Sequence, residues 1–169
     1  MNEKLSRNAP SSLFAGDAEF EGELISGLRE IFEEKIVFNK LLGLKLTSLS
    51  ATHVRASLAM RPDLVGNFSD DRLHGGVISA ALDTTGGIAV LAALCACHHN
   101  ESFDQHALRF ARLGTIDLRI DYLRPGISER FELRAEVIRL GSRIANTRME
   151  FFDSDGKLIA TGNGIYIVS

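Results

Sequence analysis

Apolar side chains recur at helical spacing between residues 19 and 40, and acidic residues stand between them. The apolar positions of this segment are Phe20, Leu24, Leu28, Ile31, Phe32 and Ile36. Positions three or four apart share one face of a helix, so the pattern predicts an amphipathic helix that lies on the surface of a larger body. Residues 1–18 are mostly polar and include Pro10, and we expect them to form a flexible leader.

Strand-like segments follow this helix and dominate the second half of the chain. Residues 44–49 and 54–60 flank a short turn, and a period of two then governs four later segments: 115–122, 131–137, 145–153 and 158–168. Alternation of apolar and polar residues is typical of strands that bury one face. The tetrapeptide Ser154-Asp155-Gly156-Lys157 separates the last two segments and is a strong hairpin signal.

Between the two strand regions, Val77–Cys97 is a run of 21 residues with a single charge, that of Asp83. A helix that is apolar on every side either crosses a membrane or is wrapped by protein, and this run is long enough for both. The charge, the interruption Thr84-Thr85-Gly86-Gly87 and the absence of a Lys/Arg cluster at either end favour wrapping. We therefore predict a buried central helix over residues 75–97 and no membrane contact.

Together these elements predict an α+β fold with one domain, residues 19–169. Along the chain they are a surface helix, two strands, a buried helix and four further strands, with no internal repeat. One antiparallel sheet curled around the apolar helix buries that helix with the fewest elements. Of the 169 residues 45% are hydrophobic, which is enough for one core of this kind.

Charge and cysteine content exclude several classes of protein. The net charge of −3 lacks the basic excess that binds a phosphate backbone, so we expect no nucleic-acid partner. Cys95 and Cys97 are too close to link distant segments, which excludes a disulfide framework and favours a cytoplasmic location. With His98 and His99 they also invite a metal site, but neighbouring helical positions point in different directions. We interpret both cysteines as core residues and expect no metal.

The candidate chemistry lies at the start of the predicted central helix. Gly75 and Gly76 would let a ligand approach the backbone, where free N–H groups at the positive end of the helix dipole can bind a carbonyl oxygen or an oxyanion. A loop-to-helix junction that needs a special backbone angle explains the same glycines equally well.

Asp83 is a second candidate, because a carboxylate on an apolar helix is costly unless it is paired or faces a ligand cavity. Its neighbours on the helix surface are all small: Gly76, Ser79, Ala80, Gly86 and Gly87. Small neighbours leave room for a substrate or for another backbone. A structural aspartate bonded to backbone amides would fit the same surroundings.

Two motifs resemble a known family. His74-Gly75-Gly76 with Asp83 nine residues after the histidine, and Thr115–Gly126 ("TIDLRIDYLRPG"), look like the hotdog-fold acyl-CoA thioesterases of the phenylacetate-pathway (PaaI-like) type. The resemblance extends from about Leu41 to Val168. It implies a hotdog fold, in which a curled antiparallel sheet wraps a long central helix, here with an extra N-terminal helix. It also implies hydrolysis of acyl-CoA thioesters without a cofactor.

The resemblance assigns roles to three residues. Asp83 would be the catalytic carboxylate, as a general base for water or as a nucleophile. The amide of Gly75 would polarise the thioester carbonyl, and Thr115 would help to position the water. The family often has an asparagine six residues before the motif histidine; here that position is Phe68, with Asn67 one position earlier, so the loop departs from the pattern.

Other residues are candidates for substrate binding. His74, Gly76 and Asn67 lie in or near the first motif, and one or two of three arginines would meet the phosphates of CoA. These arginines are Arg124, Arg139 and Arg143. The segment between residues 97 and 113 is longer than the family's usual link, and it or the extra N-terminal helix could reshape the acyl pocket.

The sequence is therefore interpreted as a thioester hydrolase that acts on acyl-CoA. Two alternatives stay open: a hotdog module that binds acyl-CoA without hydrolysing it, and a hydratase or dehydratase that pairs His74 with Asp83. No Gly-x-Ser-x-Gly elbow or Cys–His arrangement supplies a rival nucleophile.

Helix geometry adds an expectation about assembly. Gly75 and Asp83 are eight residues apart, which is roughly 12 Å along one helix. A base and an oxyanion donor must both reach one carbonyl, which two positions so far apart cannot easily do. In agreement with the dimers of the resembling family, we expect a homodimer or homotetramer with each active site at the dimer interface.

Overall fold

The computed structural model describes residues 22–168, and the expected leader over residues 1–18 lies outside this part. The helices are α1 (Gly22–Glu30), the π-helical turn η1 (Ile31–Lys35), α2 (Val37–Leu42), the 3-10 turn η2 (Pro62–Leu64), α3 (Gly75–Cys97) and α4 (Phe103–Phe110). The strands are β1 (Lys45–Leu49), β2 (His53–Ala59), β3 (Val65–Asn67), β4 (Arg72–Leu73), β5 (Gly114–Tyr122), β6 (Arg130–Leu140), β7 (Ile144–Asp153) and β8 (Leu158–Ile167). The alternating segments and the central helix are thus where the sequence predicts them.

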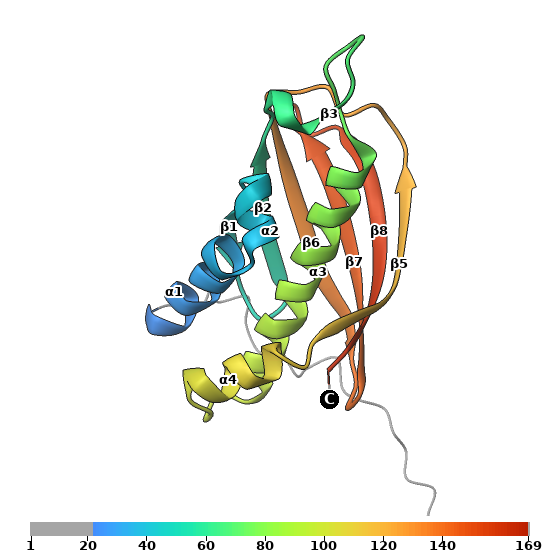
Figure 1. Ribbon diagram of the computed structural model, residues 1–169. Coiled ribbons are helices and arrows are strands. Elements are labelled where there is room, and N and C mark those ends of the chain that lie inside the picture. Colours follow the sequence, from blue (N-terminus) through green and yellow to red (C-terminus); the bar gives the residue numbers. More distant parts are fainter. Residues whose placement is uncertain (1–21, 169) are drawn as a thin grey trace, which may run out of the picture.

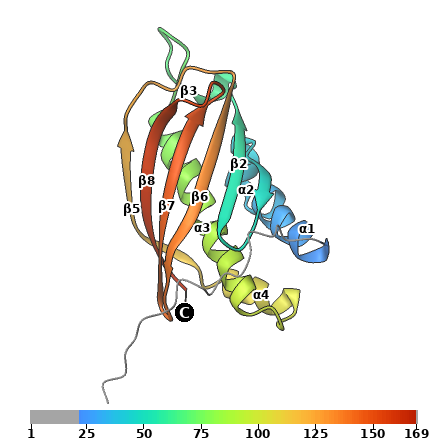
Figure 2. The ribbon, with the colours of Figure 1, turned by 180° about the vertical axis from the view of Figure 1, so that it is seen from behind.

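Six strands form one antiparallel sheet in the order β1-β2-β6-β7-β8-β5. The sheet curls around α3, as Figures 1 and 2 show from opposite sides. Its inner face is buried at every second residue, as in β2, where Val54, Ala56 and Leu58 are buried. The period of two read from the sequence is therefore the period of burial, and the predicted sheet around a helix is confirmed.

Paired charges cover much of the outer face of the sheet. The Arg134 guanidinium donates to the Glu132 carboxylate at 2.8 Å and lies 4.4 Å from the centre of the Phe152 ring, while Arg148 pairs with Glu136. Figure 2 views this face, which no helix of residues 22–168 covers. Its charges make it a solvated surface, so the apolar core lies on the inner face of the sheet, against α3 and the N-terminal helices.

Helix α3 is the core helix of the fold. It runs for 23 residues, over the predicted range 75–97. Its length and the mean hydropathy of 1.7 over its most apolar 18 residues would suit a membrane span, yet 67% of that stretch is buried inside the fold. Such burial is that of a helix wrapped by its own protein.

The N-terminal helix is interrupted, whereas the sequence pattern predicts one helix over residues 19–40. The π-helical turn η1 follows α1, and Ile36 is extended (φ −77°, ψ 93°) before α2 begins. The buried Asn39 side chain holds this arrangement, because its Nδ2 donates to the Phe32 carbonyl at 2.9 Å and to Thr84 Oγ1 at 2.8 Å. The predicted apolar face is nevertheless buried, with Leu28 and Phe32 in the core.

The sequence analysis does not predict helix α4, because it treats residues 98–113 only as a long link. A capping box begins it: Ser102 Oγ accepts from the Gln105 N–H, and the Gln105 side chain accepts from the Ser102 N–H. The sequence carries this Ser-x-x-Gln signal, which is typical of a helix start. Figure 1 shows α4 at the C-terminal end of α3.

Candidate active site

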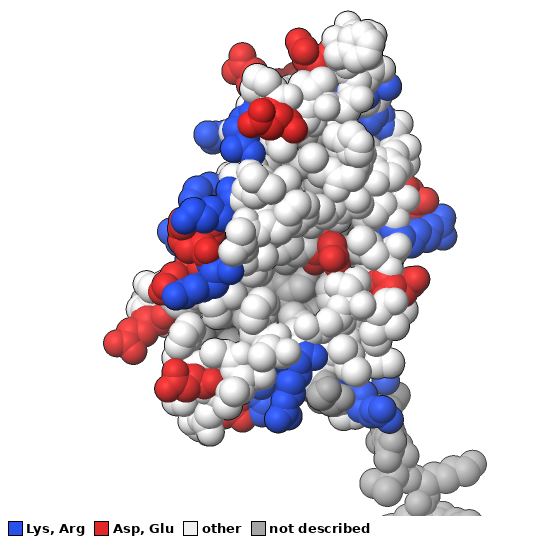
Figure 3. Space-filling model, in the orientation of Figure 1, with Lys and Arg blue, Asp and Glu red and all other residues white. Residues whose placement is uncertain are grey.

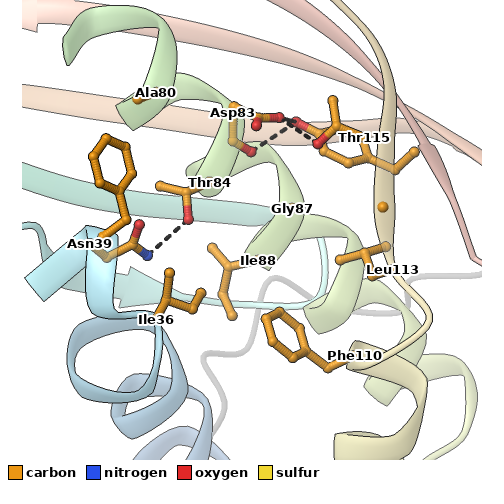
Figure 4. Close-up of a pocket in the computed structure, with 13 residues that line it drawn as sticks. Ile36, Asn39, Ala80, Asp83, Thr84, Gly87, Ile88, Phe110, Leu113 and Thr115 are labelled. Atoms are coloured by element: carbon orange, nitrogen blue, oxygen red, sulfur yellow. Dashed lines mark hydrogen bonds between the residues drawn. The ribbon is translucent and has the colours of Figure 1, made fainter. Parts of the chain in front are cut away.

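A pocket of about 260 Å³ lies between α3, the start of α2 and the segment that joins α4 to β5. Figure 4 shows Asp83 and Thr115 at one end of this pocket and Ile36 and Phe110 at the other. Its polar lining residues are Asn39, Asp83, Thr84, Thr115 and Tyr166, and its apolar ones are Ile36, Phe38, Ala80, Gly87, Ile88, Phe110, Leu113 and Gly114. The pocket is therefore an apolar cavity with a carboxylate at one end.

Two hydroxyl groups hold the Asp83 carboxylate. Thr115 Oγ1 donates to Asp83 Oδ1 at 2.9 Å, and the Tyr166 hydroxyl lies 2.9 Å from the Asp83 carbonyl oxygen and 3.2 Å from Oδ1. Asp83 is half-buried, so its second carboxylate oxygen can reach a ligand in the pocket. Oriented in this way, the carboxylate can accept a proton or attack an electrophile.

Thr115 reaches Asp83 because β5 contains an irregularity. Strict alternation would place Thr115 on the side opposite Leu118 and Ile120. The register between β5 and β8 instead shifts between Thr115 and Asp117, which leaves Ile116 exposed and turns Thr115 toward α3. A bulge of this kind re-aims one side chain, and sequence alternation alone places Thr115 on the wrong face.

Tyr166 is a residue that sequence analysis missed. Its side chain is buried on the inner face of β8, and burial together with the nearby Asp83 carboxylate raises the pKa of its hydroxyl. The hydroxyl is thus always a proton donor near neutral pH. Gly86 makes this contact possible, because a Cβ at Gly86 would overlap the Tyr166 hydroxyl and Met149 Sδ. No local sequence pattern links a glycine on the apolar helix with a tyrosine on a distant strand, so the sequence alone offers no signal for Tyr166.

The glycine motif forms the N-terminus of α3. His74 caps the helix, since its Nδ1 accepts from the Gly76 N–H at 2.8 Å, and the Tyr122 hydroxyl donates to the Gly75 carbonyl at 2.9 Å. The Gly75 N–H has no hydrogen-bond partner among residues 22–168. Of the two glycine amides, only that of Gly75 is thus open to a ligand.

Gly75 does not share the Asp83 pocket. It lines a separate hollow with Arg72, Tyr122 and Arg124, at the opposite end of the strand segment that carries Thr115. Within one chain the proposed carboxylate and the proposed oxyanion donor are therefore not brought together, as the eight-residue spacing on one helix predicts.

The remaining substrate-binding candidates are dispersed. Arg124 lies in the Gly75 hollow and donates to the Leu158 carbonyl at 2.8 Å, and Asn67 accepts from the Ser69 N–H in the preceding loop. Arg139 and Arg143 are exposed near the turn between β6 and β7, at the other end of the sheet. Of the nine predicted site residues, the structure brings Asp83 and Thr115 together in the first pocket and Gly75 and Arg124 together in the separate hollow.

Comparison with known proteins supplies the family. A family model described as the thioesterase superfamily matches residues 71–160, which contain the glycine motif, Asp83 and Thr115. The chain belongs to the thioesterase superfamily. Its relatives include the medium/long-chain acyl-CoA thioesterases YigI of Escherichia coli strain K12, 36% identical, and of Salmonella typhimurium, 37% identical. Each match covers 82% of this chain and 90% of the relative.

Solved structures agree with the family assignment. A Shewanella oneidensis protein related to the thioesterase superfamily superposes with a TM-score of 0.82 at 37% identity, over 87% of this chain and 96% of the other. A thioesterase from Haemophilus influenzae, 19% identical, shares the fold alone, with a TM-score of 0.67 over 89% of this chain and 92% of its own. The predicted hotdog fold is confirmed, and the narrower PaaI-like type stays a prediction.

The cysteines of this thioesterase differ in their surroundings. Cys95 is buried and desolvation raises the pKa of its thiol to about 12, so it is an inert core residue. Cys97 is exposed at the last residue of α3, so its interpretation as a core residue is wrong. Among residues 22–168 no three His, Cys, Asp or Glu side chains gather as metal ligands.

Replacing Thr115 by valine tests the hydrogen bond to Asp83. Thr115→Val removes one donor at 2.9 Å and keeps the shape of the side chain, so we expect kcat to fall by on the order of tenfold, the effect of one hydrogen bond to a charged group. The measurement is kcat at saturating acyl-CoA, with Thr161→Val on β8 as the matched control. A loss as complete as that of an Asp83 variant would mean that the two roles are misassigned.

Proposed function

We propose that this thioesterase hydrolyses acyl-CoA to the free acid and CoA, with Asp83 as general base or nucleophile. The observation that carries the proposal is the position of the Asp83 carboxylate at the end of an apolar pocket, where Thr115 and Tyr166 orient it. An acyl chain suits the apolar part, and the carboxylate lies where the reacting carbonyl would be. The YigI relatives, which are medium/long-chain acyl-CoA thioesterases, support the same substrate class.

If Asp83 acts as a general base, hydrolysis needs no chemical group beyond those described. Asp83 takes a proton from water as the water oxygen bonds to the thioester carbon, and the carbonyl oxygen gains negative charge. The free N–H of Gly75 at the start of α3 would bind that oxygen. The intermediate collapses, the C–S bond breaks, and the thiolate of CoA takes up the proton. Asp83 is then ionised again for the next cycle.

The arrangement of β5 supports a site made by two chains. The strand is the edge of the sheet, and its exposed apolar side chains include Ile116 and Tyr122. Figure 3 shows the face that includes α3 and β5, where largely uncharged surface, with an acidic side chain near its middle, lies between charged margins. The strand also carries Asp117, Arg119 and Asp121, and the unpaired backbone N–H and C=O groups of its edge are a ready partner for an identical strand. We therefore expect β5 to pair with β5 of a second copy.

Two-fold pairing would join the separated halves of the site. The Thr115 end of β5 contacts Asp83, and its Tyr122 end contacts Gly75. In an antiparallel pair with its axis near Leu118, the Thr115 end of one strand lies opposite the Tyr122 end of the other. The Asp83 of one chain would then face the Gly75 of its partner, twice in each dimer.

The same pairing of β5 strands suggests where the phosphates of CoA would bind. Arg124 lies in the Gly75 hollow, and the end of the sheet that carries Arg139 and Arg143 lies beyond Thr115. Antiparallel pairing of the two β5 strands would bring the Arg139 and Arg143 end of one chain toward the Arg124 hollow of the other. One or two of these arginines would then bind phosphates of CoA, with Asn67, His74 and Gly76 near the thioester.

Of the two alternatives, the hydratase has less support. Its acid–base pair needs His74 beside Asp83, but His74 Nδ1 is occupied by the Gly76 N–H at the helix start. A binding module without hydrolysis would not need an oriented carboxylate.

A thiol-release assay tests the proposed activity. Purified protein is offered a panel of straight-chain and aryl acyl-CoA esters, and free CoA is measured with a thiol reagent. We expect turnover on at least part of the panel. Binding of the esters without release of thiol on any of them would favour the binding module and overturn the proposal.

A further inference from the structure

We infer that Phe110 of α4 forms the far wall of the acyl pocket and sets the longest acyl chain that the enzyme accepts. This inference rests on the proposed function and deepens it. It assigns a role in substrate selection to α4, the helix that occupies the long link between α3 and β5.

The position of Phe110 is the first step. In Figure 4 the Phe110 ring lies at the end of the pocket away from Asp83, near Ile36 and with Ile88 between it and the carboxylate. A straight chain whose carbonyl lies at Asp83 would therefore extend past Ile88 toward this ring. Phe110 is only half-buried, so its ring is not locked into the core as Ile88 is.

Helix α4 is fixed firmly enough to act as a wall. The Arg109 guanidinium donates to both carboxylate oxygens of Glu101, from Nε at 2.7 Å and from Nη2 at 2.5 Å. His106 on the same helix is 4% exposed, and its Nδ1 lies 3.9 Å from Glu101. The bidentate ion pair and the capping box at Ser102 brace α4 against the residues that directly precede it, and the buried His106 side chain packs the helix against the body of the protein.

Gly87 keeps the middle of the pocket open. It lines the pocket one turn after Asp83, and a Cβ there would meet Leu113 Cδ2 at 3.8 Å and Tyr166 Cε1 at 3.9 Å, which are ordinary contacts. A methyl group at this position therefore fits without strain and takes up space that the glycine leaves free. The neighbouring Gly86 differs, because a Cβ there would overlap Tyr166.

Substitutions at Phe110 and at Gly87 allow the pocket to be lengthened and narrowed separately. Phe110→Ala removes the wall, while Gly87→Ala adds a methyl group beside the expected path of the chain. Each methylene accommodated or rejected by an apolar pocket changes discrimination by roughly 10-fold or more. The matched control is Leu108→Ala, since Leu108 is an apolar residue of the same helix that is 66% exposed and does not line the pocket.

The experiment measures kcat/KM for saturated acyl-CoA esters of increasing length with the full chain and these three variants. We expect Phe110→Ala to raise the ratio of long-chain to short-chain kcat/KM by at least tenfold, Gly87→Ala to lower it several-fold, and Leu108→Ala to leave it unchanged. If Phe110→Ala does not fold, Phe110→Leu shortens the same wall and is expected to shift the ratio in the same direction.

The outcomes separate this inference from the proposed function. If the wild type hydrolyses acyl-CoA and Phe110→Ala keeps the profile of Leu108→Ala, the proposed function stands and the role of Phe110 is wrong. If the wild type releases no thiol but binds acyl-CoA, the hydrolysis proposal fails, and dissociation constants across the same chain lengths test Phe110 in the same way. No binding of any acyl-CoA by the folded wild type would overturn both.

Discussion

Asp83→Asn is expected to lower kcat by at least on the order of 10²-fold while the protein stays folded. Asparagine keeps the size of the side chain and can still accept from Thr115 and Tyr166, but it can neither take a proton from water nor attack a thioester. Thermal stability should stay the same or rise, because a half-buried carboxylate on an apolar helix is replaced by a neutral amide.

The control for this variant is Asp155→Asn. Asp155 is an exposed carboxylate in the turn between β7 and β8, away from the Asp83 pocket and from β5, so the same chemical change there should leave kcat unaltered. Circular dichroism and the melting temperature check the fold of both variants. Turnover near the wild-type value in a folded Asp83→Asn protein would remove Asp83 from the chemistry.

Gly75→Pro carries the second large effect, a loss of on the order of 10²-fold in kcat, as for removal of one oxyanion donor. Proline deletes the N–H that has no hydrogen-bond partner in the described chain, so the helix loses no bond of its own. The first position of a helix tolerates proline, and His74 before it is extended (φ −66°, ψ 132°), as the residue before a proline prefers to be.

Gly75→Ala is the matched control, because alanine keeps the N–H. Its Cβ would lie 3.4 Å from Tyr122 Cε1, a contact that a small shift of the ring accommodates. We therefore expect Gly75→Ala to retain far more activity than Gly75→Pro when both are measured with the same acyl-CoA. Equal losses in the two variants would mean that space at Gly75, rather than its amide, is what matters.

Sequence periodicity predicts most of this fold. The buried helix over residues 75–97 and the alternating strands follow from apolar spacing, because each element buries one face or its whole surface in a single core. Asp83 stands out for the same reason, as the one charge on an apolar helix. The interrupted N-terminal helix is less predictable, since its break depends on the contact of Asn39 with Thr84, 45 residues away.

The details of the candidate site depend on such distant contacts. The bulge at Ile116 turns Thr115 toward Asp83, and strand register cannot be read from an alternating pattern that looks regular. Tyr166 reaches Asp83 across 83 residues of sequence through the space that Gly86 leaves. The capping box before α4 is a local signal that could have been found, whereas the packing of Phe110 against the pocket could not.

The central claim is that each active site combines the Asp83 of one chain with the Gly75 amide of another, and mixed dimers test it most directly. Asp83→Asn and Gly75→Pro chains are unfolded together in equal amounts, refolded, and separated by affinity tags so that mixed dimers are verified. One site of a mixed dimer then has both groups intact, and the other has neither.

Each variant alone should be nearly inactive. Half of the dimers in an unseparated mixture are mixed and each has one intact site, so we expect about a quarter of the wild-type turnover there, and about half in the purified mixed dimers. Verified mixed dimers that remain as inactive as the two parent variants would contradict the account and place the whole site within one chain.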